Sequence, residues 1–577
     1  MEKKYWKESV IYELYTRSFK DSNGDGIGDF GGILEKIDYL EYLGVDTVWL
    51  PPIYVSADVD RGYDVKNFRS IQPEYGTMEQ FENILTECHR RGIKLVLDIV
   101  PNHTSIEHEW FQQARSSKDN PYHNYYIWEK ENPDGTLPSN WRSHLGRPAW
   151  TWNEQTEEYY LHLYSDKQPD LNWDNPQVRQ EIYDIMRFWL EKGIDGFRID
   201  AVNVISKDRR FPDSDQETLQ AKGEEFYKNG PHIHDYLHEM NKELKRDFEF
   251  FTAGETSAVH DHDVLRYTKQ EREELDMVLS AEASELADQD EDKYKSKKWT
   301  VHDFREVLRK WQKDVGDDGG WFGLYLSHHD APRMVSTFAD DGEYRIPSAK
   351  LLATMLHTLR GTPFIFQGEE LGMTNFPHFD SIDSIDDQEA LSYYDLKVNE
   401  QGASITTIME RIRKKTRDHA RTPMQWDTSE QAGFTTGTPW LPVNPNYKEI
   451  NVQSGVDNPD SVLQFYRKLI RLRKESSIMV YGDFEIILNN HEQIFGYIRR
   501  LENEKWVILL NMTDTEAQCD IPNECVDDWD KKNYVISNYP HVDNQNTLRP
   551  YEAIVYKYVK KNRNTKEECL PNTSLLI

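Results

Sequence analysis

Two side chains at the end of one predicted strand could do acid–base chemistry. The segment 193–200 is a short apolar run that ends in a carboxylate, Asp200, with Arg198 two positions earlier. Because a strand alternates its side chains between two faces, Arg198 and Asp200 point the same way. A neighbouring cation favours the ionised form of a carboxylate. We therefore expect Arg198 to hold Asp200 ionised in a site at this strand end.

Other strand-like segments also end in polar residues. Each is short and apolar, and each is followed at once by amide, imidazole or carboxylate side chains. The segments are 94–100 before Asn102 and His103, 249–254 before Glu255, 323–327 before His328, His329 and Asp330, and 363–366 before Gln367, Glu369 and Glu370. Several strands of one sheet therefore deliver reactive groups at the same kind of position.

The spacing of these strands predicts a barrel. Helical patterns such as 78–91 and 176–192 lie between them, and strands that alternate with helices indicate parallel βαβ units. Polar residues at the carboxyl ends of the strands are typical of a (β/α)₈ TIM barrel active site. A doubly wound sheet would alternate similarly, but no Gly-rich phosphate loop follows the first strand, 10–15. We therefore expect an α/β fold built on a (β/α)₈ barrel.

Three acids on three of these strands could cleave a glycosidic bond. Asp200, Glu255 and Asp330 can converge from around the rim of one barrel. In retaining glycoside hydrolysis one carboxylate attacks the anomeric carbon, while a second, about 5–5.5 Å away, protonates the leaving oxygen and then activates water. A third carboxylate can stabilise the oxocarbenium-like transition state.

The regular alternation breaks in three places, which suggests a domain organisation. Residues 104–171 are rich in Trp, Asn, Pro and His, and we expect an inserted lobe (domain B) after the third strand. Alternating segments near the C-terminus indicate an antiparallel β-sandwich. The expected units are 1–103 (barrel, first part), 104–171 (domain B), 172–478 (barrel, second part, with an irregular cleft-covering region at about 371–445) and 479–577 (C-terminal β-sandwich with a polar tail after Lys560).

Composition narrows the class of partner. The net charge of −32 argues against nucleic acid or an anionic membrane, since both need basic patches. No run approaches the roughly 18 apolar residues of a membrane span. The first residues hold no apolar signal-peptide core, so we expect a cytoplasmic protein, as a monomer or weak dimer. Four cysteines in 577 residues form no disulfide framework, and we expect free thiols.

The motifs around the three acids resemble those of a known family. The runs 98–103 (DIVPNH), 196–200 (GFRID), 254–255 (GE) and 329–330 (HD) match the four signature regions of glycoside hydrolase family 13, the α-amylase family, in order. The runs 168–173 (QPDLNW) and 420–426 (ARTPMQW) are typical of its oligo-1,6-glucosidase and α-glucosidase branch. The resemblance extends from Trp6 to about residue 560.

The resemblance implies a role for each matching residue. Asp200 would be the nucleophile, Glu255 the acid/base and Asp330 the transition-state stabiliser. His103 and His329 would bind hydroxyls of the glucose being released. Neither histidine has zinc-ligand spacing, so no catalytic metal and no organic cofactor are expected. Asp60 and Tyr63 would close the pocket around the sugar's non-reducing end, and Arg417 would pair with Asp60 there.

The same resemblance implies a structural Ca²⁺. The segment 21–29 (DSNGDGIGD) offers oxygen donors at alternate positions, but Gly32 stands where an EF-hand has its bidentate Glu. In the related glucosidases this loop binds Ca²⁺, and Mg²⁺ is the other candidate. The matching donors are the side chains of Asp21, Asn23, Asp25 and Asp29 and the carbonyl of Ile27.

The chain departs from the family pattern around the leaving group. Ala201 follows the nucleophile, where α-1,6-selective members usually carry Val, so we do not expect strict 1,6 selectivity. His328 replaces the usual Asn, and Ala331 replaces a common Gln. The runs 256–258 and 280–284 also differ from the pattern. Substrate choice is therefore the open part of the prediction.

Three hypotheses follow. The first is a retaining, exo-acting α-glucosidase that releases terminal glucose from short α-glucosides such as maltose, isomaltose or sucrose. The second keeps the triad but changes the acceptor or substrate: a transglucosylase, a sucrose isomerase or a trehalose-6-phosphate hydrolase, although no phosphate-binding Lys/Arg cluster is identifiable. The third is a non-catalytic binding protein, like the amylase-fold subunits of amino-acid transporters. Those have a membrane segment and typically lack the full triad, which disfavours the third hypothesis.

Overall fold

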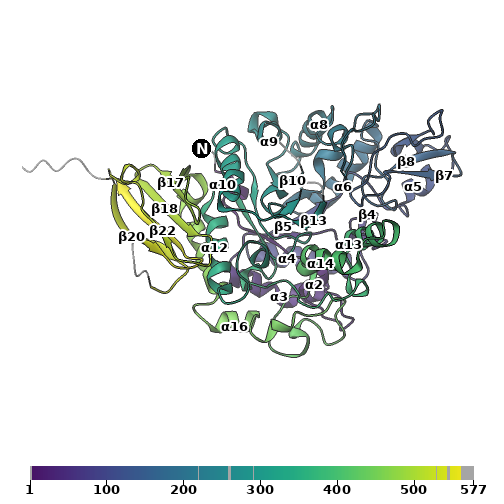
Figure 1. Ribbon diagram of the computed structural model, residues 1–577. Coiled ribbons are helices and arrows are strands. Elements are labelled where there is room, and N and C mark those ends of the chain that lie inside the picture. Colours follow the sequence, from purple (N-terminus) through teal and green to yellow (C-terminus); the bar gives the residue numbers. More distant parts are fainter. Residues whose placement is uncertain are drawn as a thin grey trace, which may run out of the picture.

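Eight parallel strands form the centre of the molecule (Figure 1). The computed structural model describes residues 3–218, 220–257, 261–289, 292–527, 529–541 and 546–560. In chain order the strands of the central sheet are β1 (Ile11–Glu13), β2 (Thr47–Leu50), β5 (Lys94–Ile99), β9 (Gly196–Ile199), β10 (Phe251–Thr256), β11 (Met277–Ser280), β14 (Gly323–Leu324) and β15 (Thr362–Phe366). An isolated parallel bridge between Val278 and Phe322 joins the two outer strands, which closes the sheet into a barrel.

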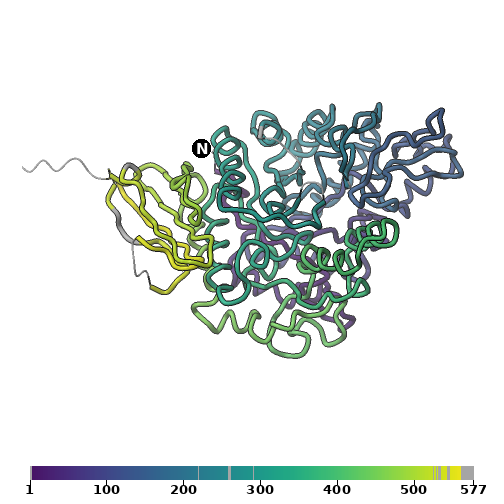
Figure 2. Tube along the Cα trace, viewed as in Figure 1, coloured from purple at the N-terminus to yellow at the C-terminus, as the bar shows by residue number. Residues whose placement is uncertain are grey.

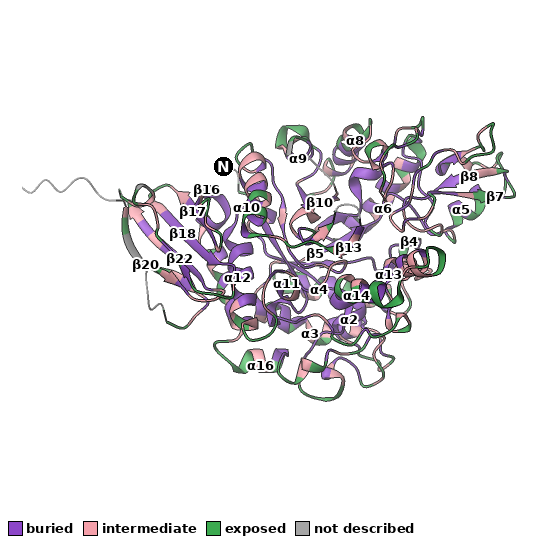
Figure 3. Cartoon of the chain, in the orientation of Figure 1, coloured by how far each residue is buried: buried purple, intermediate pink, exposed green. Residues whose placement is uncertain are grey.

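Alternating side chains fill and surround this barrel. One residue from most strands points inward and joins a central apolar cluster that includes Ile11, Trp49, Val96, Ala253, Met277 and Phe364. Their neighbours along the strands point outward and pack in the main core. The outer helices that follow the strands are α3 (Phe30–Leu43), α4 (Met78–Arg90), α6 (Pro176–Lys192), α8 (Ile233–Lys245), α9 (Asp261–Thr268), α10 (Val301–Arg309), α12 (Arg345–Thr358) and α17 (Val462–Glu475). Figure 3 shows the central strands as mostly buried, and the predicted (β/α)₈ barrel is confirmed.

An inserted lobe follows the third barrel strand, as predicted. It contains α5 (Glu109–Ala114) and a three-stranded antiparallel sheet, β6 (Trp128–Glu129), β8 (Glu158–Leu161) and β7 (Trp150–Asn153). Its apolar core includes Trp141, Trp150 and Leu161, and it is completed by Ala201 and Phe211 from the segment after β9. The lobe therefore packs directly against the residue that follows Asp200.

The region predicted as irregular between 371 and 445 contains regular helices. α13 (Gln388–Tyr394) and α14 (Ile405–Lys415) pack with the hairpin β12 (Asp288–Gln289) and β13 (Asp292–Ser296), and Tyr294 joins their small apolar core. The sequence prediction missed these helices because Gly, Pro, Asp and Asn on either side dominate the local pattern. The irregular backbone of this region lies mainly in the segments before α13 and after α14.

The C-terminal sheet is antiparallel, with the order β16 (Asp483–Ile487), β17 (Ile494–Leu501), β18 (Glu504–Asn511), β22 (Ala553–Lys560) and β20 (Trp529–Ser537). A second, two-stranded sheet, β19 (Ala517–Gln518) with β21 (Thr547–Leu548), covers one face, and the two sheets share an apolar cluster. In Figure 2 this unit lies at the opposite end of the molecule from the inserted lobe. The predicted sandwich is confirmed. The exact domain boundaries stay predictions, and the polar tail after Lys560 lies outside the described residues.

Two further expectations concern membranes and thiols. Among the helices of the described residues, none has the length and apolar character that a membrane crossing needs. Cys88 and Cys519 are buried free thiols, whereas Cys569 lies outside the described residues.

Candidate active site

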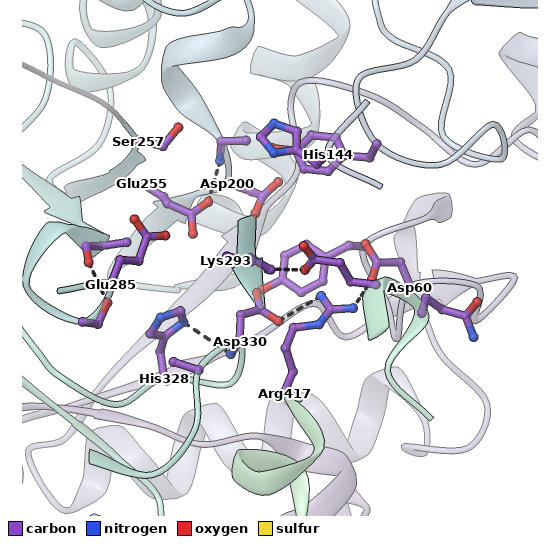
Figure 4. A pocket seen from close by; sticks show the side chains of 18 of the residues that line it. Asp60, His144, Asp200, Glu255, Ser257, Glu285, Lys293, His328, Asp330 and Arg417 are labelled. Carbon is purple, nitrogen blue, oxygen red and sulfur yellow. Dashed lines mark hydrogen bonds and ion pairs between the residues drawn. The ribbon is translucent and has the colours of Figure 1, made fainter. Parts of the chain in front are cut away.

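The carboxyl ends of neighbouring strands bring the three predicted acids together. Glu255 lies near the end of β10, Asp200 directly follows β9, and Asp330 lies in the turn after β14. All three line one cavity of about 270 Å³. Figure 4 shows Asp200 and Glu255 side by side, with Asp330 below them. The sequence therefore placed all three acids in one site, while their catalytic roles stay predictions.

One arginine joins the two carboxylates of the predicted pair. Arg198 Nη1 lies 2.6 Å from Asp200 Oδ1, and Arg198 Nη2 lies 2.6 Å from Glu255 Oε1. A third carboxylate, Asp98, accepts from the same Nη1 at 3.0 Å. The parallel register explains this contact, because Asp98 on β5 is the direct partner of Arg198 on β9. Arg198 thus orients three acids at once.

Burial and the Arg198 charge act in opposite directions on the carboxylates of this cluster. Burial raises the pKa of Asp98 to about 6 and raises the pKa of Asp200 above its usual range, while the guanidinium opposes both shifts. Three carboxylates around one cation carry excess negative charge, so the cluster favours taking up a proton. Arg198 favours the ionised form of Asp200 but shares its charge with Asp98 and Glu255, and the expectation that it holds Asp200 ionised stays a prediction.

Asp330 sits in a cationic environment. His329 Nε2 lies 3.1 Å from Asp330 Oδ2, and Arg421 Nη2 donates to Asp330 Oδ1 at 2.6 Å. Although burial opposes ionisation, His329 and Arg417 hold the pKa of Asp330 well below its usual range. Asp330 is therefore a fixed negative charge beside the pair.

His329 carries the matching positive charge. Its Nδ1 lies 2.5 Å from Oε1 of Glu13, a buried acid at the end of β1. Although burial lowers it, the Asp330 and Glu13 carboxylates raise the pKa of His329 to about 10. Tyr63 also reaches His329 Nε2, at 2.8 Å. Both ring nitrogens are thus engaged by the protein, and the expected contact with a sugar hydroxyl stays a prediction.

The same residues also form a cluster of possible metal ligands. Ligand atoms of His328, His329 and Asp330 lie within 4.8 Å of one another. A metal ligand must offer a deprotonated nitrogen, whereas His329 is held as imidazolium. The expectation of no catalytic metal therefore stays a prediction.

The far end of the cavity contains the predicted glucose-binding residues. Arg417 Nη2 lies 3.6 Å from Asp60 Oδ1, so the predicted pair is present. Gln168 Nε2 lies 3.2 Å from both Asp60 Oδ2 and His103 Nε2. Burial lowers the pKa of His103 to about 4, so its imidazole is neutral. Asp60, Tyr63, His103 and Arg417 line the cavity, whereas Arg198 and His329 lie behind it in contact with lining carboxylates.

Arg417 makes further contacts that the sequence did not predict. Its Nη1 lies 3.2 Å from Asp330 Oδ1, and its Nε donates to Asp387 Oδ1 at 2.7 Å. Glu13, Gln168 and Arg421 were also missed, although each stood at a strand end or inside a quoted motif. Lys293, Glu285 and Glu389 gave no local signal, because long-range packing brings them to the cavity.

The residues that depart from the family pattern cluster on the leaving-group side. Those that line the cavity are Ala201, Thr256, Ser257, Ala281, Ser284, His328 and Ala331. Ala258 lies outside the described residues. Small side chains at 201, 281, 284 and 331 leave room for a second sugar. We predict that these positions set substrate choice.

The loop 21–29 has the donor set for a hard cation. Gly24 and Gly26 have positive φ, which lets the chain curl so that oxygen donors recur at every second residue. Asp21 and Asp29 are buried, and Asp21 Oδ2 also accepts from Thr435 Oγ1 at 2.5 Å. Oxygen donors of this kind suit Ca²⁺ or Mg²⁺. The donor chemistry therefore fits the predicted ion, whose presence stays a prediction.

Comparison with known proteins identifies the family. The catalytic-domain model of α-amylase matches residues 13–482. The chain belongs to the α-amylase family. It is similar to an oligo-1,6-glucosidase of Parageobacillus thermoglucosidasius, with 49% identity over 96% of this chain and 99% of that protein. As a member of this family the protein is a glycoside hydrolase, which confirms the resemblance inferred from its motifs.

Two solved structures of the α-amylase family share the whole architecture. A trehalose-6-phosphate hydrolase of Bacillus licheniformis has 44% identity and a TM-score of 0.92, covering 96% of this chain and 100% of that one. An isomaltulose synthase of Erwinia rhapontici has 41% identity and a TM-score of 0.92, covering 96% and 99%. Relatives with this fold thus differ in the sugar they act on.

Proposed function

We propose that the protein is a retaining, exo-acting α-glucosidase that releases terminal glucose from short α-glucosides by double displacement. The observation that carries this proposal is the shared contact of Asp200 and Glu255 with Arg198. One guanidinium holds both acids at adjacent strand ends, facing one cavity. Similarity to oligo-1,6-glucosidases adds support.

In the first step Asp200 attacks the anomeric carbon and the glycosidic C–O bond breaks. Glu255 gives its proton to the leaving oxygen, so the aglycone departs as a neutral alcohol. The product of the step is a covalent glucosyl ester of Asp200.

In the second step water attacks the same carbon, and Glu255 accepts the proton that water loses. The ester bond to Asp200 breaks, and α-glucose leaves. Asp330, fixed as an anion by His329 and Arg421, stabilises the positive charge that develops on the sugar ring in both steps. Two inversions retain the configuration.

The Asp60 end of the cavity would recognise the terminal glucose. Asp60, Arg417 and Gln168 form a connected set of donors and acceptors suited to sugar hydroxyls. Exo action follows if this set closes the cavity behind the non-reducing end. Maltose, isomaltose and sucrose are the expected substrates, because small side chains widen the leaving-group side.

A structural ion completes the proposal. Asp21, Asn23, Asp25, Asp29 and the Ile27 carbonyl would hold Ca²⁺ or Mg²⁺ in the loop before α3. The ion would stabilise the loop against residues 434–440, since Asp21 N–H donates to the Phe434 carbonyl and Trp440 N–H donates to the Gly26 carbonyl. It supplies charge and rigidity, and no chemical step depends on it.

A substrate panel tests the proposal. We expect efficient release of glucose from maltose, isomaltose or sucrose, and slow turnover of long maltodextrins, by comparison of kcat/KM. Dominant activity on trehalose 6-phosphate would instead favour the activity of the B. licheniformis relative, and conversion of sucrose to an isomer would favour the synthase. Preference for long polymers would contradict the proposal that Asp60, Arg417 and Gln168 close the cavity behind the non-reducing end.

A further inference from the structure

The leaving-group side of the cavity carries its own set of charges. Glu285, Asp288 and Lys293 come from the segment between β11 and β13, while Glu389 and Lys415 come from α13 and α14. In Figure 4 Glu285 and His328 lie on the side opposite Asp60. Any group attached to the departing oxygen must meet these charges.

Both lysines on this side are already paired. Lys293 Nζ forms an ion pair with Glu389, and Lys415 Nζ forms one with Asp288. Although burial works against its charge, Glu389 raises the pKa of Lys293, which therefore stays an ammonium bound to its own carboxylate. Neither cation is available without breaking a pair.

Glu285 has no such compensation. Within the described residues its carboxylate forms no hydrogen bond or ion pair, although it lines the cavity. The cations that act on it, Lys293 and Lys228, are each paired with another glutamate, Glu389 and Glu224. Glu285 is exposed and lines the cavity, so its carboxylate presents an unpaired negative charge to whatever group occupies that side.

We propose that Glu285 selects the leaving group by charge, so that the cavity accepts an uncharged or cationic aglycone and rejects a phosphorylated one. The inference rests on the proposed α-glucosidase activity and specifies the substrate class of the same site. A phosphate needs unpaired Lys or Arg donors, whereas among the described residues this set offers three carboxylates and two ammonium groups that are already paired. Hydroxyl or ammonium groups can instead donate to Glu285.

This selection would separate the protein from relatives that act on phosphorylated sugars. The trehalose-6-phosphate hydrolases share about the same identity with this chain as the isomaltulose synthases do. Overall sequence identity therefore does not distinguish between these two substrate classes. A charge on the leaving-group side of the cavity does distinguish between phosphorylated and unphosphorylated substrates.

Three aryl α-glucosides with one scaffold test the inference. The para substituent of the phenol is hydroxymethyl, aminomethyl or phosphonooxymethyl, so that the aglycones differ mainly in charge. We expect kcat/KM for the phosphate to be at least about 10-fold below that for the neutral compound, with the difference shrinking as salt is added. A wild-type enzyme that hydrolyses the phosphate as fast as the neutral compound would overturn the inference.

Variants assign the effect to one residue. Glu285→Lys should raise the phosphate-to-neutral ratio of kcat/KM by at least about 10-fold, and Glu285→Gln, which keeps the shape, should raise it by less. Glu271→Lys makes the same charge change at an exposed position and should leave the ratio unaltered. An unchanged ratio in both Glu285 variants would refute the assignment. Failure to hydrolyse even the neutral glucoside would instead refute the α-glucosidase proposal.

Discussion

The backbone N–H of Ala201 donates a hydrogen bond of 3.0 Å to Glu255 Oε2. Ala201 adopts a left-handed conformation, with φ 42° and ψ 41°, in the turn directly after Asp200. For a residue with a Cβ this conformation costs about 1–2 kcal/mol. The turn therefore aims one N–H at the predicted acid/base while its methyl group lines the leaving-group side.

Substitution of Ala201 should change linkage preference. Ala201→Val adds two methyl groups on the leaving-group side, so we expect the maltose-to-isomaltose ratio of kcat/KM to fall about 10-fold or more. Because a β-branched residue resists positive φ, Tm should fall as well. Ala201→Gly, which adopts the turn freely, is the control for backbone strain. Equal losses on both disaccharides in Ala201→Val would contradict a role in linkage choice.

Removal of the predicted nucleophile should abolish turnover. Asp200→Ala leaves no group to form the glucosyl ester, so kcat on p-nitrophenyl α-glucoside should fall by at least about 10⁴-fold. Added azide should restore part of the activity and yield β-glucosyl azide, since the anion enters from the vacated face. Turnover like that of the wild type would rule out the assignment of Asp200.

The charge on His329 should make stability depend on pH. The folded-state pKa of about 10 lies above the ordinary value of 6.5, so the stabilisation is complete below pH 6.5 and is lost as pH rises to about 10. The Tm of the wild type should therefore fall across this window by more than that of His329→Asn. Parallel pH curves for the two proteins would show that His329 is not held as imidazolium.

Arg417 should matter for both binding and turnover. The guanidinium of Arg417 contacts Asp60, Asp330 and Asp387 at once, and the single ammonium group of a lysine cannot make all three contacts. Arg417→Lys should therefore lower kcat/KM on maltose about 10²-fold. Arg413→Lys, an exposed change on α14, is the matched control. Equal kcat/KM values for the two variants would show that Arg417 does not contribute to substrate binding or turnover.

Chelation tests the predicted ion. Treatment with EDTA should lower Tm, and Ca²⁺ or Mg²⁺ should restore it with a saturable binding isotherm in calorimetry. Asp21→Ala should abolish both responses, because Asp21 contributes a buried donor and anchors the loop to Thr435. If the binding isotherm of Asp21→Ala matched that of the wild type, loop 21–29 would be excluded as the ion-binding site.

Strand-end motifs allowed much of the fold and site to be predicted. The periodicity of α4 and α6 predicted their bounds to within a residue, because both helices have an apolar face and clear terminal signals. Asp200, Glu255 and Asp330 could be placed together because parallel strands end at the same rim.

The rest depended on contacts between distant segments. The pairing of Glu13 with His329 joins the first and seventh barrel strands, and the pairing of Lys293 with Glu389 joins a hairpin to α13. No local pattern encodes such contacts. The sharing of Arg198 among three acids also needed the sheet register, since Asp98 lies 100 residues away in sequence.

The stereochemistry of the product tests the central claim most directly. Double displacement through Asp200 predicts that ¹H NMR of a fresh p-nitrophenyl α-glucoside digest shows the released glucose as the α-anomer first, with the β-anomer appearing only by mutarotation. Initial release of β-glucose would contradict the account, because it would require a single inversion by water.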